Sequence, residues 1–354
     1  ARGFKKAFVA SDPDLIKFGV SKKVTDVLDD AGIAYEMFSE IKPNPTIQNV
    51  QSGVEAFKAS GADCIVAIGG GSSMDTAKAI GIIIKNPEFA DVRSLEGVAP
   101  TKNKCVPIIA VPTTAGTAAE VTINYVITDA EKNRKMVCVD VHDIPVVAVV
   151  DPDMMSSMPK GLTAATGMDA LTHCMEAYVS TFASMFTDAN ALHGIREIVE
   201  WLPKSYAGDH EARQHMHEAQ CIAGIAFSSG LLGIVHSMAH KTGAAFENGH
   251  IIHGAANAMY LPKVIAFNAK DPEAKKRYGV IADEMKLGGA NDDEKVKLLI
   301  EYLRGMNDAL NIPHCIKHYG PDSYPTEQGF VPENVFLERL PEIATVSYTH
   351  LRAH

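Results

Sequence analysis

Apolar residues recur along the first 150 residues in two alternating patterns: short continuous runs, and longer stretches with helical spacing. Continuous runs indicate strands that are buried on both faces, and spacing of three and four residues indicates helices. The predicted strands span residues 5–11, 35–38, 64–68, 106–111 and 146–150. The predicted helices between them span residues 15–31, 46–60 and 74–85. Such alternation predicts a Rossmann-like parallel sheet flanked by helices.

After Asp151 the pattern changes to helical spacing alone, and no run with strand alternation follows Leu162. The predicted helices span residues 164–182, 188–201, 211–228, 231–246, 254–267 and 293–310. We therefore predict an α/β dinucleotide-binding domain over residues 1–158 and an all-helical metal-binding and substrate domain over 159–346. Residues 347–354 break a helical pattern that starts near Pro332 and fades by Ala344. They are predicted to be a foreign tail.

The charge and the apolar runs of the chain argue against a nucleic-acid-binding protein and against a membrane protein. The formal net charge is −10, and Lys and Arg are nowhere concentrated enough to neutralise phosphates, which argues against a nucleic-acid partner. The longest apolar runs, such as residues 144–150, fall far short of the roughly 20 residues that span a bilayer. We expect a cytoplasmic protein without a membrane segment. The six cysteines are scattered singly without a C-x-x-C pair, which favours reduced, buried thiols.

A glycine-rich loop follows the predicted strand at residues 64–68 and reads Gly-Gly-Gly-Ser-Ser over residues 69–73. Glycines allow a pyrophosphate to approach the backbone, and the N-terminus of the next helix supplies N–H groups and a positive dipole end. The spacing matches neither G-x-G-x-x-G nor a P-loop. A tight turn capped by Ser72 or Ser73 is the alternative interpretation.

Two further features lie at the ends of predicted strands. Residues 112–120 form a loop rich in small hydroxyl side chains, which is either a ligand-binding loop or a hydroxyl-rich turn. Asp12 follows the first strand, where a carboxylate can bind the ribose hydroxyls and repel a 2′-phosphate, so that NAD is favoured over NADP. Asp12 followed by Pro13 also fits a helix N-cap.

The predicted helical domain carries two pairs of ionisable residues that are one helical turn apart. Asp169 and His173 form one pair, His236 and His240 form the other, and His253 lies beyond them. One carboxylate with three imidazoles suits Fe(2+) or Zn(2+) and does not select strongly between them. The alternative is that these are ordinary core or surface residues.

Taken together, these segments resemble the iron-containing (group III) alcohol dehydrogenases. The resemblance is carried by residues 112–129 and 134–145, by Ala-Thr-Gly-Met-Asp-Ala-Leu-Thr-His over 165–173, and by His-Ser-Met-Ala-His over 236–240. It extends from Lys5 to about Ala344. It implies the two-domain fold shared with dehydroquinate synthase, namely an N-terminal Rossmann-like domain followed by an all-helical domain.

The resemblance also implies roles for individual residues. The implied metal ligands are Asp169, His173, His236 and His253, and His250 is an outer-sphere candidate. The implied cofactor-binding residues are Asp12, Asn44, Gly70, Gly71, Ser72, Thr113, Thr114, Thr117, Asn124 and Lys135. The positions near the substrate are Asn124, Val126, Val137 and Phe227.

The resemblance also implies the reaction: the reversible, NAD-dependent reduction of lactaldehyde to 1,2-propanediol by a homodimer, with Fe(2+) or alternatively Zn(2+) polarising the carbonyl oxygen. We expect NAD and the small aldehyde or alcohol substrate to meet in a cleft between the domains. His240 either relays a proton to the product, or only orients a ligand or packs. The alternatives are another primary-alcohol, butanol or 1,3-propanediol dehydrogenase of the family, a dehydroquinate-synthase-like lyase, and a metal-stabilised binding protein without turnover.

Overall fold

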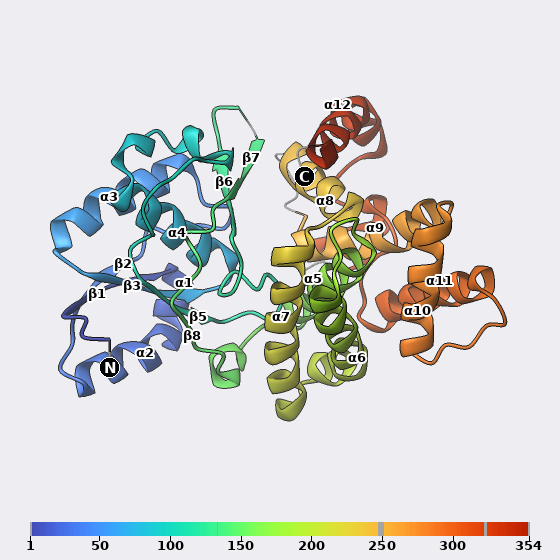
Figure 1. Ribbon diagram of the computed structural model, residues 1–354, viewed down its shortest axis with the longest axis horizontal. Coiled ribbons are helices and arrows are strands. Elements are labelled where there is room, and N and C mark those ends of the chain that lie inside the picture. Colours follow the sequence, from blue (N-terminus) through green and yellow to red (C-terminus); the bar gives the residue numbers. More distant parts are fainter. Residues whose placement is uncertain (1, 133, 247–250, 322–323, 353–354) are drawn as a thin grey trace. The chain divides into compact units, whose positions relative to one another are not determined.

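The computed structural model describes residues 2–132, 134–246, 251–321 and 324–352 (Figure 1). It describes their side chains except those of 244, 342 and 345–352. The chain divides into two compact units. Unit 1 comprises Ala1–Thr114 and Ala118–Met155, and unit 2 comprises Ala115–Thr117 and Ser156–His354. The domain boundaries expected from the sequence, at 158/159 and 346/347, stay predictions.

Unit 1 is built on a five-stranded, fully parallel sheet with the strand order β2-β1-β3-β5-β8. The strands are β1 (Lys6–Ser11), β2 (Ala34–Phe38), β3 (Cys64–Gly69), β5 (Ile108–Pro112) and β8 (Val147–Ala148). The predicted parallel α/β architecture is confirmed. The strand predicted at 146–150 is shorter than expected: β8 has 2 residues, lies at the sheet edge and pairs with β5 alone.

Helices cover both faces of this sheet. Alternate β1 side chains face opposite sides: Phe8 packs in one core cluster and Val9 in the other. The helices of unit 1 are α1 (Pro13–Lys17), α2 (Val20–Asp30), α3 (Ile47–Ser60) and α4 (Gly71–Lys85). Residues of α3 and α4 belong to the cluster with Phe8. Val20 of α2 belongs to the cluster with Val9, and Leu15 of α1 packs against that cluster. The single helix predicted at 15–31 is wrong, because Gly19 adopts φ +75° and separates two helices.

A small second sheet, which the hydrophobic pattern did not predict, lies beside α4. It contains β4 (Gly97–Val98), β6 (Asn124–Asp129) and β7 (Arg134–Val139) in the order β4-β7-β6, with β6 and β7 antiparallel. Tyr125 and Cys138 face the core from this hairpin. Short 3-10 helices in the described part of the chain include η1 (Pro87–Phe89), η2 (Val92–Leu95), η3 (Pro152–Met155) and η4 (Ile316–His318).

Unit 2 is helical, and no strand element occurs in its described residues, which confirms the predicted all-α part. Its helices are α5 (Lys160–Val179), α6 (Met185–Ala207), α7 (His210–Gly230), α8 (Ile234–Ala245), α9 (His253–Asn268), α10 (Pro272–Glu284), α11 (Asp292–Ala309) and α12 (Glu333–Arg352). Helix α5 is buried on nearly all sides and packs against α6, α7 and α9. The helical pattern expected to fade by Ala344 continues in α12 to Arg352.

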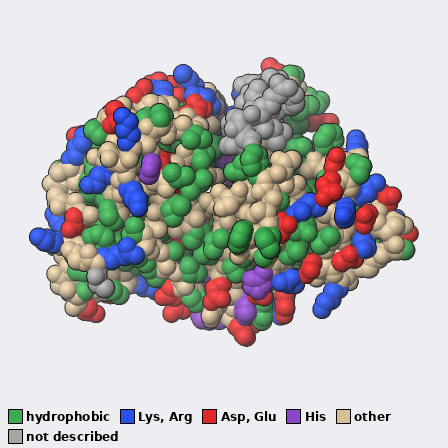
Figure 2. Space-filling view, viewed as in Figure 1, with side chains coloured by type: hydrophobic (Ala, Val, Ile, Leu, Met, Phe, Trp, Pro, Cys, Tyr) green, Lys and Arg blue, Asp and Glu red, His purple; other side chains and the backbone are tan. Residues whose placement is uncertain are grey.

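The surface bears on two expectations about partners. Acidic and basic side chains are intermixed on the visible face, most densely over α10 and α11, and no single basic patch dominates it (Figure 2). In the described part of the chain, no single helix is long and apolar enough to cross a bilayer. The pair His210–Gly230 and Ile234–Gly243, bent by 105°, meets that criterion by length and composition only.

Candidate active site

Six of the predicted cofactor-binding residues, all in unit 1, lie at the carboxyl ends of three adjacent strands. Asp12 follows β1, the glycine loop follows β3, and Thr113 and Thr114 follow β5. The chain runs from β1 outward to β2 and then returns to place β3 on the other side of β1. Such a reversal of strand order is where doubly wound sheets bind their ligands. These residues therefore lie at the end of the sheet where doubly wound folds bind ligands, and their contacts with a dinucleotide stay a prediction.

The glycine loop makes a tight turn into α4. Gly69 has φ +147°, and a Cβ atom there would lie 2.2 Å from Ser73 Oγ, so a larger residue does not fit. Gly70 is the N-cap of α4 and no side chain caps this helix, so the turn is not the one capped by Ser72 or Ser73. The N–H groups at the start of α4 thus keep their capacity to bind an anionic group.

Asp12 is the N-cap of α1. Its Oδ1 accepts hydrogen bonds from the backbone N–H groups of Asp14 and Leu15, each at 3.0 Å. Oδ2 has no hydrogen-bond partner among the described residues. The helix cap and a contact with the ribose are therefore compatible, and the ribose contact stays a prediction.

The remaining loop residues lie on both sides of the division between the units. Thr114 lies against Gly70 in unit 1, where a Cβ on that glycine would be 3.1 Å from Thr114 Cγ2. Thr117 belongs to the short segment of unit 2, and its neighbour Gly116 packs closely on Thr166 of α5. Asn44 precedes α3 and has φ +55°. The loop after it joins the second sheet through an isolated bridge between residues 46 and 128.

The β6–β7 hairpin presents four predicted site residues on one face. In its antiparallel register, Val126 pairs with Val137, and alternate positions carry Asn124 and Lys135. All four side chains are partly exposed, whereas Tyr125 and Cys138 on the opposite face are buried. Burial lowers the pKa of Lys135, and the carboxylate of Asp75 opposes this shift. Their contacts with cofactor and substrate remain predictions.

A buried ionic network, absent from the sequence-based prediction, supports this hairpin. Lys78 of α4 is fully buried, and its Nζ donates hydrogen bonds to the carbonyl oxygens of Thr122 and Asn124. Nζ also lies 3.7 Å from Oδ1 of the buried Asp143. Burial raises the pKa of Asp143 to about 7, against the opposing pull of Lys78. The network ties the start of β6 to α4.

Replacing Asp143 with asparagine is expected to flatten the pH dependence of unfolding. With its folded pKa raised, Asp143 keeps a proton that the unfolded chain releases, so its contribution to stability falls as pH rises from about 4 to about 7. The wild-type protein should lose about 1.4 kcal/mol more per pH unit than the variant in that window. Urea unfolding at several pH values measures this, and identical slopes would contradict it.

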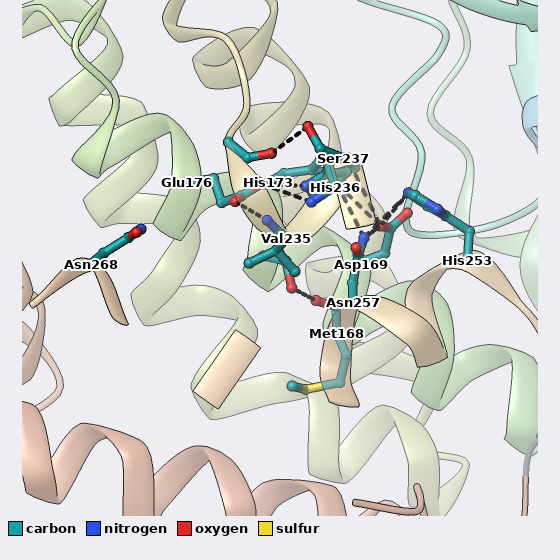
Figure 3. Close-up of polar contacts among 12 residues, drawn as sticks. Met168, Asp169, His173, Glu176, Val235, His236, Ser237, His253, Asn257 and Asn268 are labelled. Carbon is teal, nitrogen blue, oxygen red and sulfur yellow. Dashed lines mark hydrogen bonds and ion pairs between the residues drawn. The ribbon is translucent and has the colours of Figure 1, made fainter. Parts of the chain in front are cut away.

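In unit 2, three imidazole nitrogens surround one carboxylate oxygen. Helix α5 supplies a carboxylate and one imidazole on successive turns, and α8 and α9 each supply one imidazole from their N-terminal ends (Figure 3). The Nε2 atoms lie 3.6 to 3.9 Å from Asp169 Oδ1, and they belong to His173, His236 and His253. Asp169, His173 and His236 also form a buried group whose ligand atoms lie within 4.8 Å of one another.

This donor set fits a divalent cation. Bonds of about 2.0–2.2 Å to nitrogen and oxygen hold neighbouring ligand atoms roughly 3–3.5 Å apart, close to the separations found here. Burial would favour a neutral Asp169, but the surrounding imidazoles outweigh it and hold the pKa of this carboxyl well below its usual range. Burial lowers the pKa of His173 to about 4, so this ring is neutral and can act as a ligand.

The protonation of His236 differs from that of His173. Burial lowers its pKa, but hydrogen bonds with Asp169 and Glu176 outweigh burial and raise the pKa to about 9. A metal-binding imidazole must be neutral, so this ring has to lose a proton before it can act as a ligand.

Two other predicted residues border the cluster. The ring of Phe227 stacks on His173 with centroids 4.2 Å apart, and the ring of His240 stacks on His253 at 4.5 Å. Phe227 is buried and shields one face of the cluster. His240 therefore lies beside the predicted ligands, and its proton-relay role stays a prediction. His250 lies outside the described residues.

Two buried polar residues of this cluster were not predicted. Glu176 accepts a hydrogen bond from His236 Nδ1 at 2.6 Å, and Asn257 Nδ2 donates to Asp169 Oδ1 at 2.6 Å (Figure 3). The sequence holds a signal for both. Glu176 falls seven residues after Asp169, and Asn257 four after His253, so each shares a helix face with a predicted ligand.

Comparison with known proteins identifies the family. Residues 1–152 match the family model "Iron-containing alcohol dehydrogenase", and residues 163–345 match "Fe-containing alcohol dehydrogenase family, C-terminal". The chain is 49% identical to lactaldehyde reductase of Escherichia coli over 90% of the chain and 83% of the relative. It is 46% identical to the NADPH-dependent butanol dehydrogenase of Clostridium saccharobutylicum, over 90% and 81%.

A solved structure agrees with these matches. The crystal structure of a 1,3-propanediol oxidoreductase aligns with a TM-score of 0.87 at 35% identity, over 98% of this chain and 86% of the other. Membership of such a family implies a bound metal ion and a nicotinamide cofactor. The chain belongs to the iron-containing alcohol dehydrogenase family and is a metal-dependent alcohol dehydrogenase.

Proposed function

We propose that this enzyme catalyses the reversible, NAD-dependent reduction of lactaldehyde to 1,2-propanediol. The observation that carries the metal-dependent part is the convergence of three Nε2 atoms on Asp169 Oδ1. The identity of 49% with lactaldehyde reductase supports the substrate. The proposed ligands are Asp169, His173, His236 and His253, and Fe(2+) is the proposed ion, with Zn(2+) as the alternative.

The chain's own residues supply positioning and proton handling. When bound, the divalent ion supplies an electrophile for the carbonyl oxygen. Phe227 excludes water from the face of His173 that it covers. His240 is proposed to hold a proton for the product oxygen, since an ordinary imidazole exchanges protons near neutral pH. Asn124, Val126 and Val137, on the exposed face of the hairpin, are proposed to contact the substrate.

We propose that residues at the carboxyl ends of the parallel strands bind the cofactor and select between NAD and NADP. The first turn of α4 takes the pyrophosphate at Gly70, Gly71 and Ser72. Asp12, through Oδ2, takes the ribose and disfavours the 2′-phosphate of NADPH. The remaining proposed contacts are those of Asn44, Thr113, Thr114, Thr117, Asn124 and Lys135. A homodimer and a cytoplasmic location remain predictions.

An anaerobic assay that follows the oxidation of NADH or NADPH tests the proposal. Lactaldehyde, butanal and 3-hydroxypropanal are compared with NADH and with NADPH, in protein stripped of metal and then supplied with Fe(2+) or Zn(2+). We expect lactaldehyde with NADH to give a kcat/KM at least about tenfold higher than the other pairs, a preference of roughly 1.4 kcal/mol. A preference for butanal with NADPH would instead favour the butanol dehydrogenase activity for which one relative is named.

A further inference from the structure

Glu176 is a buried carboxylate on the same face of α5 as Asp169 and His173. Its side chain is 4% exposed and reaches the first turn of α8 (Figure 3). Oε1 accepts a hydrogen bond from Val235 N at 2.7 Å. Oε2 lies 2.6 Å from Nδ1 of His236 and 3.3 Å from its backbone N. One carboxylate thus contacts both the backbone that carries His236 and the ring itself.

We propose that Glu176 is a positioning residue that prepares His236 to bind the metal. A carboxylate only accepts hydrogen bonds, so Nδ1 must carry the proton in this contact. The neutral ring then has its lone pair on Nε2, the atom that lies 3.6 Å from Asp169 Oδ1. Such an outer hydrogen bond fixes both the tautomer and the ring orientation of a histidine ligand. The inference rests on the proposed metal site.

The start of α8 is shaped around this carboxylate. Gly233 is the N-cap of α8 and no side chain of α8 caps the helix, so Glu176 takes the place of a local cap. A Cβ atom at Gly233 would lie 2.9 Å from Glu176 Oε1. The glycine therefore leaves room for the carboxylate to approach the helix. The position of α8 and the orientation of the His236 ring therefore both depend on Glu176.

Glutamine has the same shape as glutamate, but it cannot both accept from the backbone of α8 and accept from the ring of His236. Glu176 receives three hydrogen bonds on two oxygens, whereas glutamine has one oxygen and a donating NH₂ group. If its oxygen faces the ring, the NH₂ group opposes the N–H of Val235. If the amide is turned over, the NH₂ group faces Nδ1 of His236 and favours the tautomer with the proton on Nε2. In either orientation, the variant disrupts the arrangement that presents Nε2 to a metal.

The test is the metal affinity of Glu176→Gln in the full chain. Zinc and cobalt dissociation constants are measured by competition with a chelator, and the visible spectrum of the cobalt form reports the ligand geometry. We expect affinity to fall about 10- to 100-fold, with an altered cobalt spectrum. Gly233→Ala, which crowds the carboxylate without removing it, should weaken zinc binding in the same direction by a smaller factor.

The matched control is Asp209→Ala, which removes a carboxylate that caps a different helix of unit 2. Asp209 accepts from Ala212 N at 2.8 Å at the start of α7. It should lower the thermal midpoint of the metal-free protein and leave the zinc dissociation constant unchanged. Zinc affinity equal to wild type in both Glu176→Gln and Gly233→Ala would overturn the inference. A wild-type protein that binds no zinc or cobalt would overturn the proposed metal site itself.

Discussion

Replacing Asp169 with asparagine is expected to remove the bound metal and at least about three orders of magnitude of aldehyde-reducing activity. Asp169 Oδ1 is the atom around which the three Nε2 atoms are arranged, and Asp169 is the only carboxylate among the predicted ligands. Asparagine keeps the shape but offers a neutral oxygen or an NH₂ group. The site would then lack the charge that balances a divalent cation.

The measurement is elemental analysis of the purified variant together with its rate of NADH oxidation. Asp283→Asn is the matched control, because it removes the same charge from an exposed position in α10 that pairs with Lys295. The control should retain both metal and activity. Full metal occupancy in Asp169→Asn would refute its assignment as a ligand, and full activity without metal would refute the metal-dependent chemistry.

Replacing Gly254 with alanine is expected to disrupt the cluster through packing alone. A Cβ atom at Gly254 would lie 2.0 Å from the backbone oxygen of Ala165 and 3.0 Å from Asp169 Cβ. Backbone atoms cannot rotate away, so α9 would have to move from α5 and carry His253 with it. We expect a loss of about 3 kcal/mol in the free energy of unfolding, at the upper end of overpacking effects.

A second glycine-to-alanine change provides the comparison. Gly305 lies within α11, and a Cβ there would meet no described atom within 4 Å. Gly305→Ala should stabilise the protein by roughly 0.5–1 kcal/mol, because alanine is the better helix residue. Urea unfolding and zinc affinity are measured for both variants. A Gly254→Ala protein with wild-type stability and affinity would show that the approach of α9 to α5 is not required.

The parallel sheet was predictable because each strand carries its own signal. Strands buried on both faces are continuous apolar runs, and β3 and β5 stand out for this reason. The β6–β7 hairpin was missed although alternate residues such as Tyr125 and Ile127 are buried. Its exposed face is partly apolar too, so the alternation is weak. The break at Gly19 was also missed, because a single glycine within helical spacing does not by itself specify a left-handed residue.

By itself, the sequence determined the two kinds of architecture and the pairs of residues one turn apart on a single helix. Those are local properties, set by the spacing of side chains along one element. Only the tertiary structure decided that α5, α8 and α9 meet with three imidazoles around Asp169, and that Glu176 and Lys78 are buried beside their partners. Contacts between separate elements depend on how the helices pack against one another. The spacing of residues within one helix does not specify which other helices it will contact.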